Sequence, residues 1–179
     1  MYAVDDLDAV VALEELPRSD AGAPLPLVLS DAQSTLVAYV VPDALVSDLA
    51  SLTDGVPEDR EVMAVVRFAG CYAHMFGPPN DEAFAGHPLA RRGLRPYGAF
   101  RVQNSSWLRG LEPMNAVHPH HRREAFLKHE HFVLSFHDST FECIARSAEP
   151  FPRYTRTAFV VRRMTMLLKQ APGSIDLLG

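Results

Sequence analysis

The sequence from residue 129 to residue 146 reads His-Glu-His-Phe-Val-Leu-Ser-Phe-His-Asp-Ser-Thr-Phe-Glu-Cys-Ile-Ala-Arg. Apolar residues recur at every second position on both sides of Asp138-Ser139, the pattern of two strands that share one apolar face. We therefore expect a β-hairpin that turns at Asp138–Ser139, with Phe136 opposite Phe141 and Leu134 opposite Cys143. A four-residue loop over residues 137–140 keeps the same register.

The polar face of this hairpin is the first candidate site. In the expected register Glu142 lies opposite Ser135 and diagonal to His137, and cross-strand neighbours of this kind are close enough for long side chains to meet. A carboxylate beside an imidazole makes an acid–base pair. The prediction is that His137 is the general acid or base and Glu142 orients it, while His131 and Ser135 position a substrate. The alternative is an ordinary solvated sheet face.

The same face suggests a metal site as a variant. His129, His131 and His137 would all project from one side of the first strand, and imidazoles are common ligands of divalent transition metals. No HExxH or similar spacing accompanies them.

A second candidate site is a cluster of three arginines around Gly93. Arg91, Arg92 and Arg95 could bind a carboxylate or phosphate group of a ligand. A solvated basic loop is the alternative explanation.

On both sides of the hairpin, short apolar runs typical of strands alternate with apolar stripes typical of helices, without a βαβ repeat. This order of elements predicts a single α+β domain over residues 25–179, preceded by an acidic arm or loop over residues 1–24. An antiparallel-rich sheet is expected with three to four interspersed helices. Expected strands cover 26–30, 36–41, 62–68 continuing through 71–76, and 97–103, and expected helices follow Asp43 and Ser105 and cover 157–170.

Composition limits the function. The chain has 179 residues, is 47% hydrophobic and carries a formal net charge of −5, so neither nucleic acid nor an anionic membrane is an expected partner. It has no run of about 20 apolar residues and no secretory signal. Two cysteines without a CxxC spacing fit a reducing compartment, and we expect a cytoplasmic protein.

We expect different surroundings for the two cysteines. Cys143 lies on the apolar hairpin face and is expected to be inert. Cys71 and His74 are three residues apart in an expected strand, which would place them on opposite faces and disfavour a Cys–His pair.

Two functional hypotheses follow. The first is a small enzyme that uses the His–Glu face on a small polar substrate, with or without a metal. The second is a non-catalytic module that binds a small ligand or a protein partner, a homodimer included.

Overall fold

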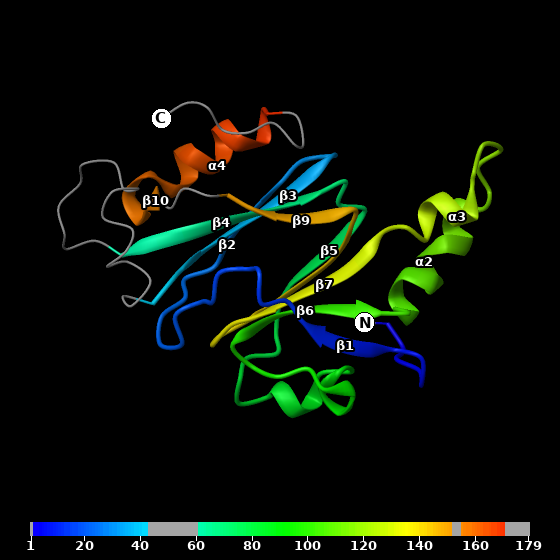
Figure 1. Cartoon of the computed structure of the whole chain (residues 1–179), viewed down its shortest axis with the longest axis horizontal. Coiled ribbons are helices and arrows are strands. Elements are labelled where there is room, and N and C mark those ends of the chain that lie inside the picture. The colour runs from blue at the N-terminus through cyan, green and yellow to red at the C-terminus, as the bar shows by residue number, and fades with distance from the viewer. Residues whose placement is uncertain (1, 43–60, 152–154, 171–179) are drawn as a thin grey trace.

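A computed structural model describes residues 2–42, 61–151 and 155–170 (Figure 1). The described residues form ten strands in two antiparallel sheets, together with three α-helices. The predicted α+β class and antiparallel pairing are confirmed at this level. The helix expected after Asp43 lies outside the described residues.

The first sheet has the strand order β1-β6-β7-β8-β5. Its strands are β1 (Ala9–Ala12), β5 (Ala73–Gly77), β6 (Gly98–Gln103), β7 (Glu130–Ser135) and β8 (Thr140–Ala145). Residues 9–12 were expected to belong to a loose arm, but they pair with β6 as an edge strand.

The second sheet is built around β4, which is buried along its whole length. The order is β10-β4-β3-β2, and β9 also pairs with β4. Its strands are β2 (Leu27–Ser30), β3 (Ser34–Val40), β4 (Val62–Ala69), β9 (Ser147–Pro150) and β10 (Thr155–Arg156).

The main core lies between the two sheets. Phe68 of β4 contacts Phe132 and Phe141, with ring centroids 5.6 and 5.1 Å apart. The alternate residues of the hairpin that we expected on an apolar face all belong to this core. The 129–146 pattern therefore predicted correctly which side chains face inward.

Helices and turns cover the outer faces. Helix α4 (Val160–Leu168), preceded by the 3-10 turn η4 (Thr157–Phe159), packs on the second sheet. The outer face of the first sheet is covered by residues 2–8 and by α2 (Ser106–Asn115), α3 (Arg123–Phe126), η2 (Phe84–Gly86) and η3 (Ala90–Arg92). In Figure 1, α4 and α2 accordingly lie at opposite sides of the molecule.

Two expectations about the sheets were wrong. A single sheet was expected, with the strand over residues 62–68 continuing through residues 71–76. Instead Gly70 adopts a left-handed conformation with φ of +59°, and the chain turns there from β4 in one sheet to β5 in the other. Glycine reaches this conformation without the steric cost that a Cβ would add.

The hairpin register is the second correction. The structure pairs Leu134 with Phe141 and Ser135 with Thr140, which is two residues away from the expected pairing. The turn is centred on residues 137–138, and the amide of Phe136 donates to the carbonyl of Ser139 at 2.9 Å. Because strand side chains alternate with period two, an even shift preserves both faces but changes every cross-strand neighbour.

Among the described helices, none combines the length and the apolar character that crossing a membrane requires.

Candidate functional site

Glu142 lies at the centre of a buried polar network on the outer face of the first sheet. Its Oε1 accepts a hydrogen bond from His87 Nε2 at 3.0 Å. Its Oε2 accepts from His131 Nε2 at 3.0 Å and from the Tyr2 hydroxyl at 2.6 Å. Glu142 is 4% exposed and His131 is fully buried. We call Tyr2, His87, Ser105, His131 and Glu142 the carboxylate network.

Sheet geometry brings two of these residues together. Val133 lies opposite Glu142 and His131 lies opposite Ile144, so His131 and Glu142 are diagonal neighbours on one face. His87 enters from the turn after η2. His131 and Glu142 lie on one face of the hairpin as expected, and the different register makes them neighbours, which was not predicted.

Backbone contacts orient both imidazoles. The amide of Leu89 donates to His87 Nδ1 at 3.1 Å, so the proton of a neutral His87 ring must lie on Nε2, facing the carboxylate. On the other side, Ser105 Oγ lies 2.9 Å from His131 Nδ1 and accepts from the amide of Leu108. Ser105 is thus the N-cap of α2 and the outer support of His131.

Aromatic rings close the network from solvent. The rings of Tyr2 and Trp107 stack with centroids 5.3 Å apart, and both meet the edge of the His131 ring. This outer face of the hairpin, for which an ordinary solvated sheet face was the alternative, is therefore covered.

The network stabilises an ionised carboxylate. Burial alone would raise the pKa of Glu142, but the hydrogen bonds from His131, His87 and Tyr2 outweigh burial and lower that pKa to about 2. Burial beside this carboxylate also raises the pKa of the Tyr2 hydroxyl, which keeps its proton and remains a donor. The arrangement satisfies a buried charge with three donors.

His137 does not take part in this network, contrary to the predicted His137–Glu142 pair. It lies in the hairpin turn with its side chain 40% exposed, where Nδ1 is 2.9 Å from Asp138 Oδ1. Its Nε2 is 4.0 Å from Asp81 Oδ2, and the Tyr97 hydroxyl donates to the same Asp81 oxygen. We call Asp81, Tyr97, His137 and Asp138 the rim cluster.

Charges in the rim cluster favour a protonated imidazole. The hydrogen bond to Asp138, followed by the charge of Asp81, raises the pKa of His137. The hydrogen bond from Tyr97 lowers the pKa of Asp81. The exposed imidazole of His137 therefore lies between two carboxylates that both favour its protonated form.

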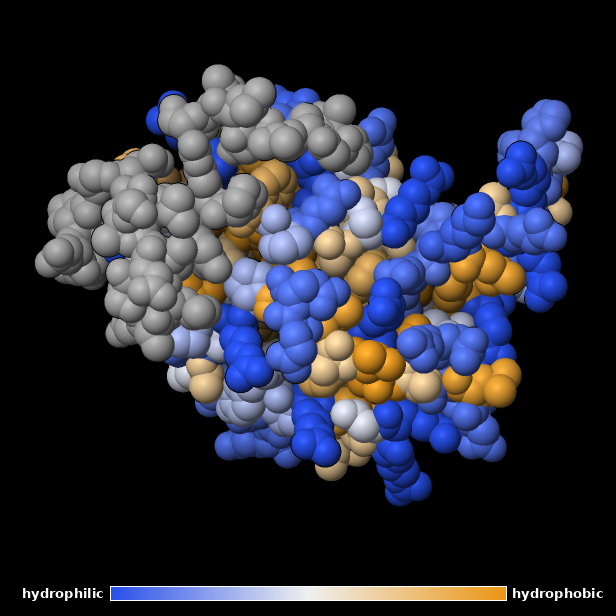
Figure 2. Space-filling model, viewed as in Figure 1, coloured by the Kyte–Doolittle hydropathy of each residue, from blue (hydrophilic) through white to orange (hydrophobic). Residues whose placement is uncertain are grey.

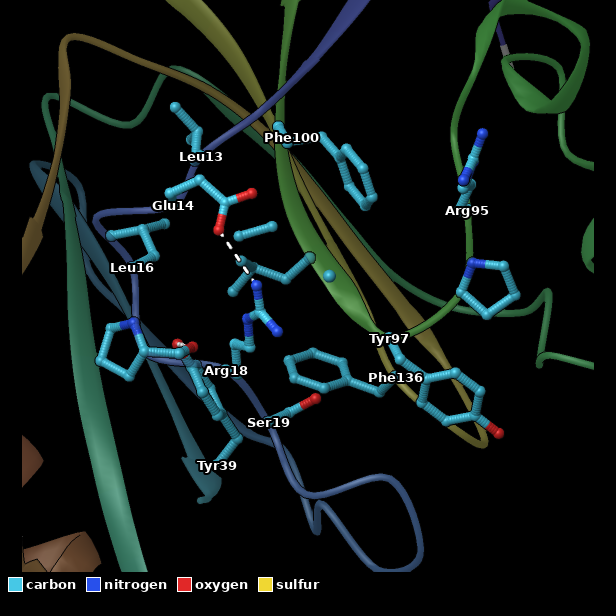
Figure 3. A pocket seen from close by; sticks show the side chains of 16 residues that line it. Leu13, Glu14, Leu16, Arg18, Ser19, Tyr39, Arg95, Tyr97, Phe100 and Phe136 are labelled. Atoms are coloured by element: carbon cyan, nitrogen blue, oxygen red, sulfur yellow. Dashed lines mark hydrogen bonds and ion pairs between the residues drawn. The ribbon is translucent and has the colours of Figure 1, made fainter. Parts of the chain in front are cut away.

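A cleft of about 290 Å³ opens between the two sheets beside this cluster. Figure 3 shows Phe100 and Phe136 across the cleft from Glu14 and Arg18, which are joined by an ion pair of 3.1 Å. Its lining includes four aromatic residues and three charged ones, Glu14, Arg18 and Arg95. Small-molecule sites likewise combine aromatic side chains with a few polar groups.

Tyr97 belongs to both the cleft and the rim cluster. Its ring lines the cleft, and its centroid lies 6.3 Å from that of His137. Its backbone has a φ of +60°, which is unusual for a residue with a Cβ. Ser135 holds this turn, because its Oγ lies 2.8 Å from the carbonyl of Arg95 and 3.1 Å from the amide of Gly98. The predicted substrate-positioning residue Ser135 is 1% exposed and instead supports the backbone.

The three predicted arginines do not converge on one point. Arg92 forms an ion pair with Asp6, Arg91 is exposed, and the Arg95 side chain points away from the Glu14–Arg18 pair in Figure 3. Binding of an anion by any one of them stays a prediction.

The predicted metal ligands are also separated. His129 Nδ1 donates to the carbonyl of Phe126 at 2.7 Å, whereas His131 lies in the carboxylate network and His137 in the turn. Within residues 2–42, 61–151 and 155–170, no group of three or more metal-ligating side chains comes together.

Sequence reasoning missed Tyr2, His87, Asp81 and Tyr97 because they reach the hairpin from distant segments. Only Ser105 had a signal, as the expected cap of a helix.

Comparison with protein-family models, with curated proteins and with solved structures gives no match for the chain.

Proposed function

We propose that the protein is a small enzyme that performs general acid–base chemistry on a small polar molecule. His137 is the proton donor and acceptor, and the substrate extends from the cleft over the Tyr97 ring to the rim cluster. The supporting observation is the position of Tyr97, whose ring borders the cleft while its hydroxyl bonds Asp81 beside His137. A left-handed non-glycine residue costs on the order of 1 kcal/mol, and such strain concentrates at functional sites.

The proposed chemistry follows from the surroundings of His137. Its raised pKa makes the imidazolium the prevalent form over a wider pH range, so it can donate a proton near neutrality. Asp138 and Asp81 stabilise this form, and because His137 is open to solvent, water supplies the proton that restores it after each transfer. Arg95 and Arg18 line the cleft and provide positive charge for an acidic group of the substrate.

Glu142, His131 and Ser135 have a supporting part in this proposal. Glu142 and His131 fix the outer face of the hairpin, and Ser135 fixes the Tyr97 turn. They are positioning residues, because their side chains are buried and bond only to other groups of the protein. The proposal retains the predicted cytoplasmic location.

The test compares wild type with H137Q and D81N. Each protein is incubated with a mixture of amino acids, hydroxy acids, sugar phosphates and acyl esters, and compound levels are followed by mass spectrometry. We expect at least one compound to be converted by wild type and by H120Q, a control at an exposed turn histidine outside both clusters. Conversion that survives in H137Q would contradict the proposal.

A non-catalytic ligand-binding protein is the second candidate, and the aromatic walls of the cleft favour it. The face in Figure 2 carries small hydrophobic groups separated by hydrophilic ones, which favours a small ligand over a protein partner on that face. Amide chemical-shift changes confined to the cleft, without conversion of any compound, would support this candidate.

A further inference from the structure

The two cysteines lie at the point where the chain passes from one sheet to the other. Cys71 follows the Gly70 turn after β4, and Cys143 is in the middle of β8. Cys71 packs against the core cluster that contains Cys143. Tyr72 and Ala73 both lie opposite Ile144, which brings Cys71 close to Cys143 across β5 and β8. The Cys71 Sγ also lies 3.5 Å from the Ala73 carbonyl.

The two thiols differ in access. Cys143 is fully buried, whereas Cys71 is half-buried and lines a surface cleft of about 650 Å³ together with Tyr72, His129 and Arg146. A small solute can therefore reach Cys71, whereas Cys143 is shielded within the core.

The surroundings of Cys71 stabilise its thiolate. The pKa of Cys71 is lowered to about 6, and the interaction with Cys143 makes the largest contribution. Burial acts in the opposite direction, whereas Thr35 and His74 lower the pKa further. Burial raises the pKa of Cys143, which stays a thiol.

The proximity of His74 corrects the expectation that it and Cys71 face opposite sides. The backbone between Cys71 and His74 is not a regular strand, because β5 begins only at Ala73. The Tyr72 amide donates to the carbonyl of Ile144, although Ile144 is already the partner of Ala73 in the sheet. A count of three residues therefore does not fix their faces.

We propose that Cys71 and Cys143 form a reversible intramolecular disulfide when the protein meets hydrogen peroxide. The Cys71 thiolate attacks one peroxide oxygen, an S–O bond forms, the O–O bond breaks, and the leaving hydroxide takes a proton to become water. The Cys143 sulfur then attacks the Cys71 sulfenic acid and loses its proton, the S–O bond breaks, and a second water leaves. The two thiols together lose two electrons, which reduce the peroxide.

Thiolate content sets the expected reactivity. With a pKa of about 6, Cys71 is ~90% thiolate at pH 7, against ~3% for an ordinary cysteine. This ~30-fold gain is offset by ~13-fold lower intrinsic nucleophilicity, which leaves about a twofold faster reaction. The pH at which Cys71 becomes reactive is therefore a sharper measure than its rate at one pH.

The experiment treats the reduced full chain with hydrogen peroxide, denatures it in N-ethylmaleimide and measures its intact mass. We expect loss of two hydrogen atoms, protection of both cysteines from alkylation, a peptide pair linking Cys71 to Cys143, and full reversal by dithiothreitol. Two alkylatable cysteines after treatment, linkage between molecules, or a sulfinic acid on Cys71 beside a free Cys143 would overturn the proposal.

Variants separate the two roles. In C143A, dimedone should trap a sulfenic acid on Cys71, and in C71S the buried Cys143 should resist peroxide. If C143A fails to fold, alkylation of Cys71 in wild type by iodoacetamide gives an independent test. We expect a midpoint near pH 6 that rises in H74Q but not in H118Q; a midpoint near the ordinary cysteine value of about 8.5 would overturn the proposal.

Discussion

Replacing Glu142 with Gln tests the claim that the carboxylate network stabilises the fold through a charge. Glutamine has nearly the same shape, but its NH₂ group would face hydrogen-bond donors. His87 cannot reverse its role, because its Nδ1 already accepts from the Leu89 amide. Tyr2 and His131 must therefore both become acceptors for the NH₂ group, or a donor is left opposite a donor in a buried site, and either arrangement costs free energy.

The pKa of Glu142 gives the magnitude. The carboxyl has an ordinary pKa of 4.5 and a folded-state pKa of about 2, and at about 1.4 kcal/mol per unit this difference corresponds to about 3 kcal/mol. Because the folded-state value is the lower one, this stability is fully present above pH 4.5 and is lost as the pH falls towards 2. E142Q should thus be about 3 kcal/mol less stable than wild type at pH 7, and the two should converge near pH 2.

Urea unfolding followed by circular dichroism at several pH values measures this difference. E130Q is the matched control, since the Glu130 side chain is 38% exposed and pairs with Arg101 at the surface; we expect its effect to be within about 0.5 kcal/mol. Parallel pH profiles for wild type and E142Q would refute the reasoning, because the ionised network would then contribute nothing that an amide does not.

Three further predictions concern individual contacts. Y2F removes one donor to the central carboxylate and should lower the unfolding free energy by about 1–2 kcal/mol, measured by urea unfolding; no loss would mean that the bond is not formed. D138N should lower the pKa of His137, read from its imidazole proton shifts, whereas an unchanged titration would exclude the contact. G98A places a Cβ 2.8 Å from the Phe100 ring, so it should displace the ring and weaken binding of any ligand found for the cleft, measured by calorimetry.

Much of the fold could be predicted from local patterns, and most of the site could not. Period-two alternation predicted the two faces of the hairpin correctly, because sheet geometry is local. The register was wrong by two, since an even shift leaves both faces intact and the apolar pattern cannot detect it. His87 and Tyr2 reach Glu142 across 55 and 140 residues of sequence, and no periodicity links residues so far apart.

Glu142 and His137 of the hairpin differ in their exposure to solvent, and this difference gives them different roles. Glu142 is sealed beneath aromatic rings, so its charge acts on the segments around it and not on a solute. His137 is open to solvent, so it can exchange protons but contributes little to stability, since exposed ion pairs are weak. Substitution at Glu142 should therefore change the unfolding free energy far more than substitution at His137, whereas a variant at His137 should change chemistry in a protein that folds normally.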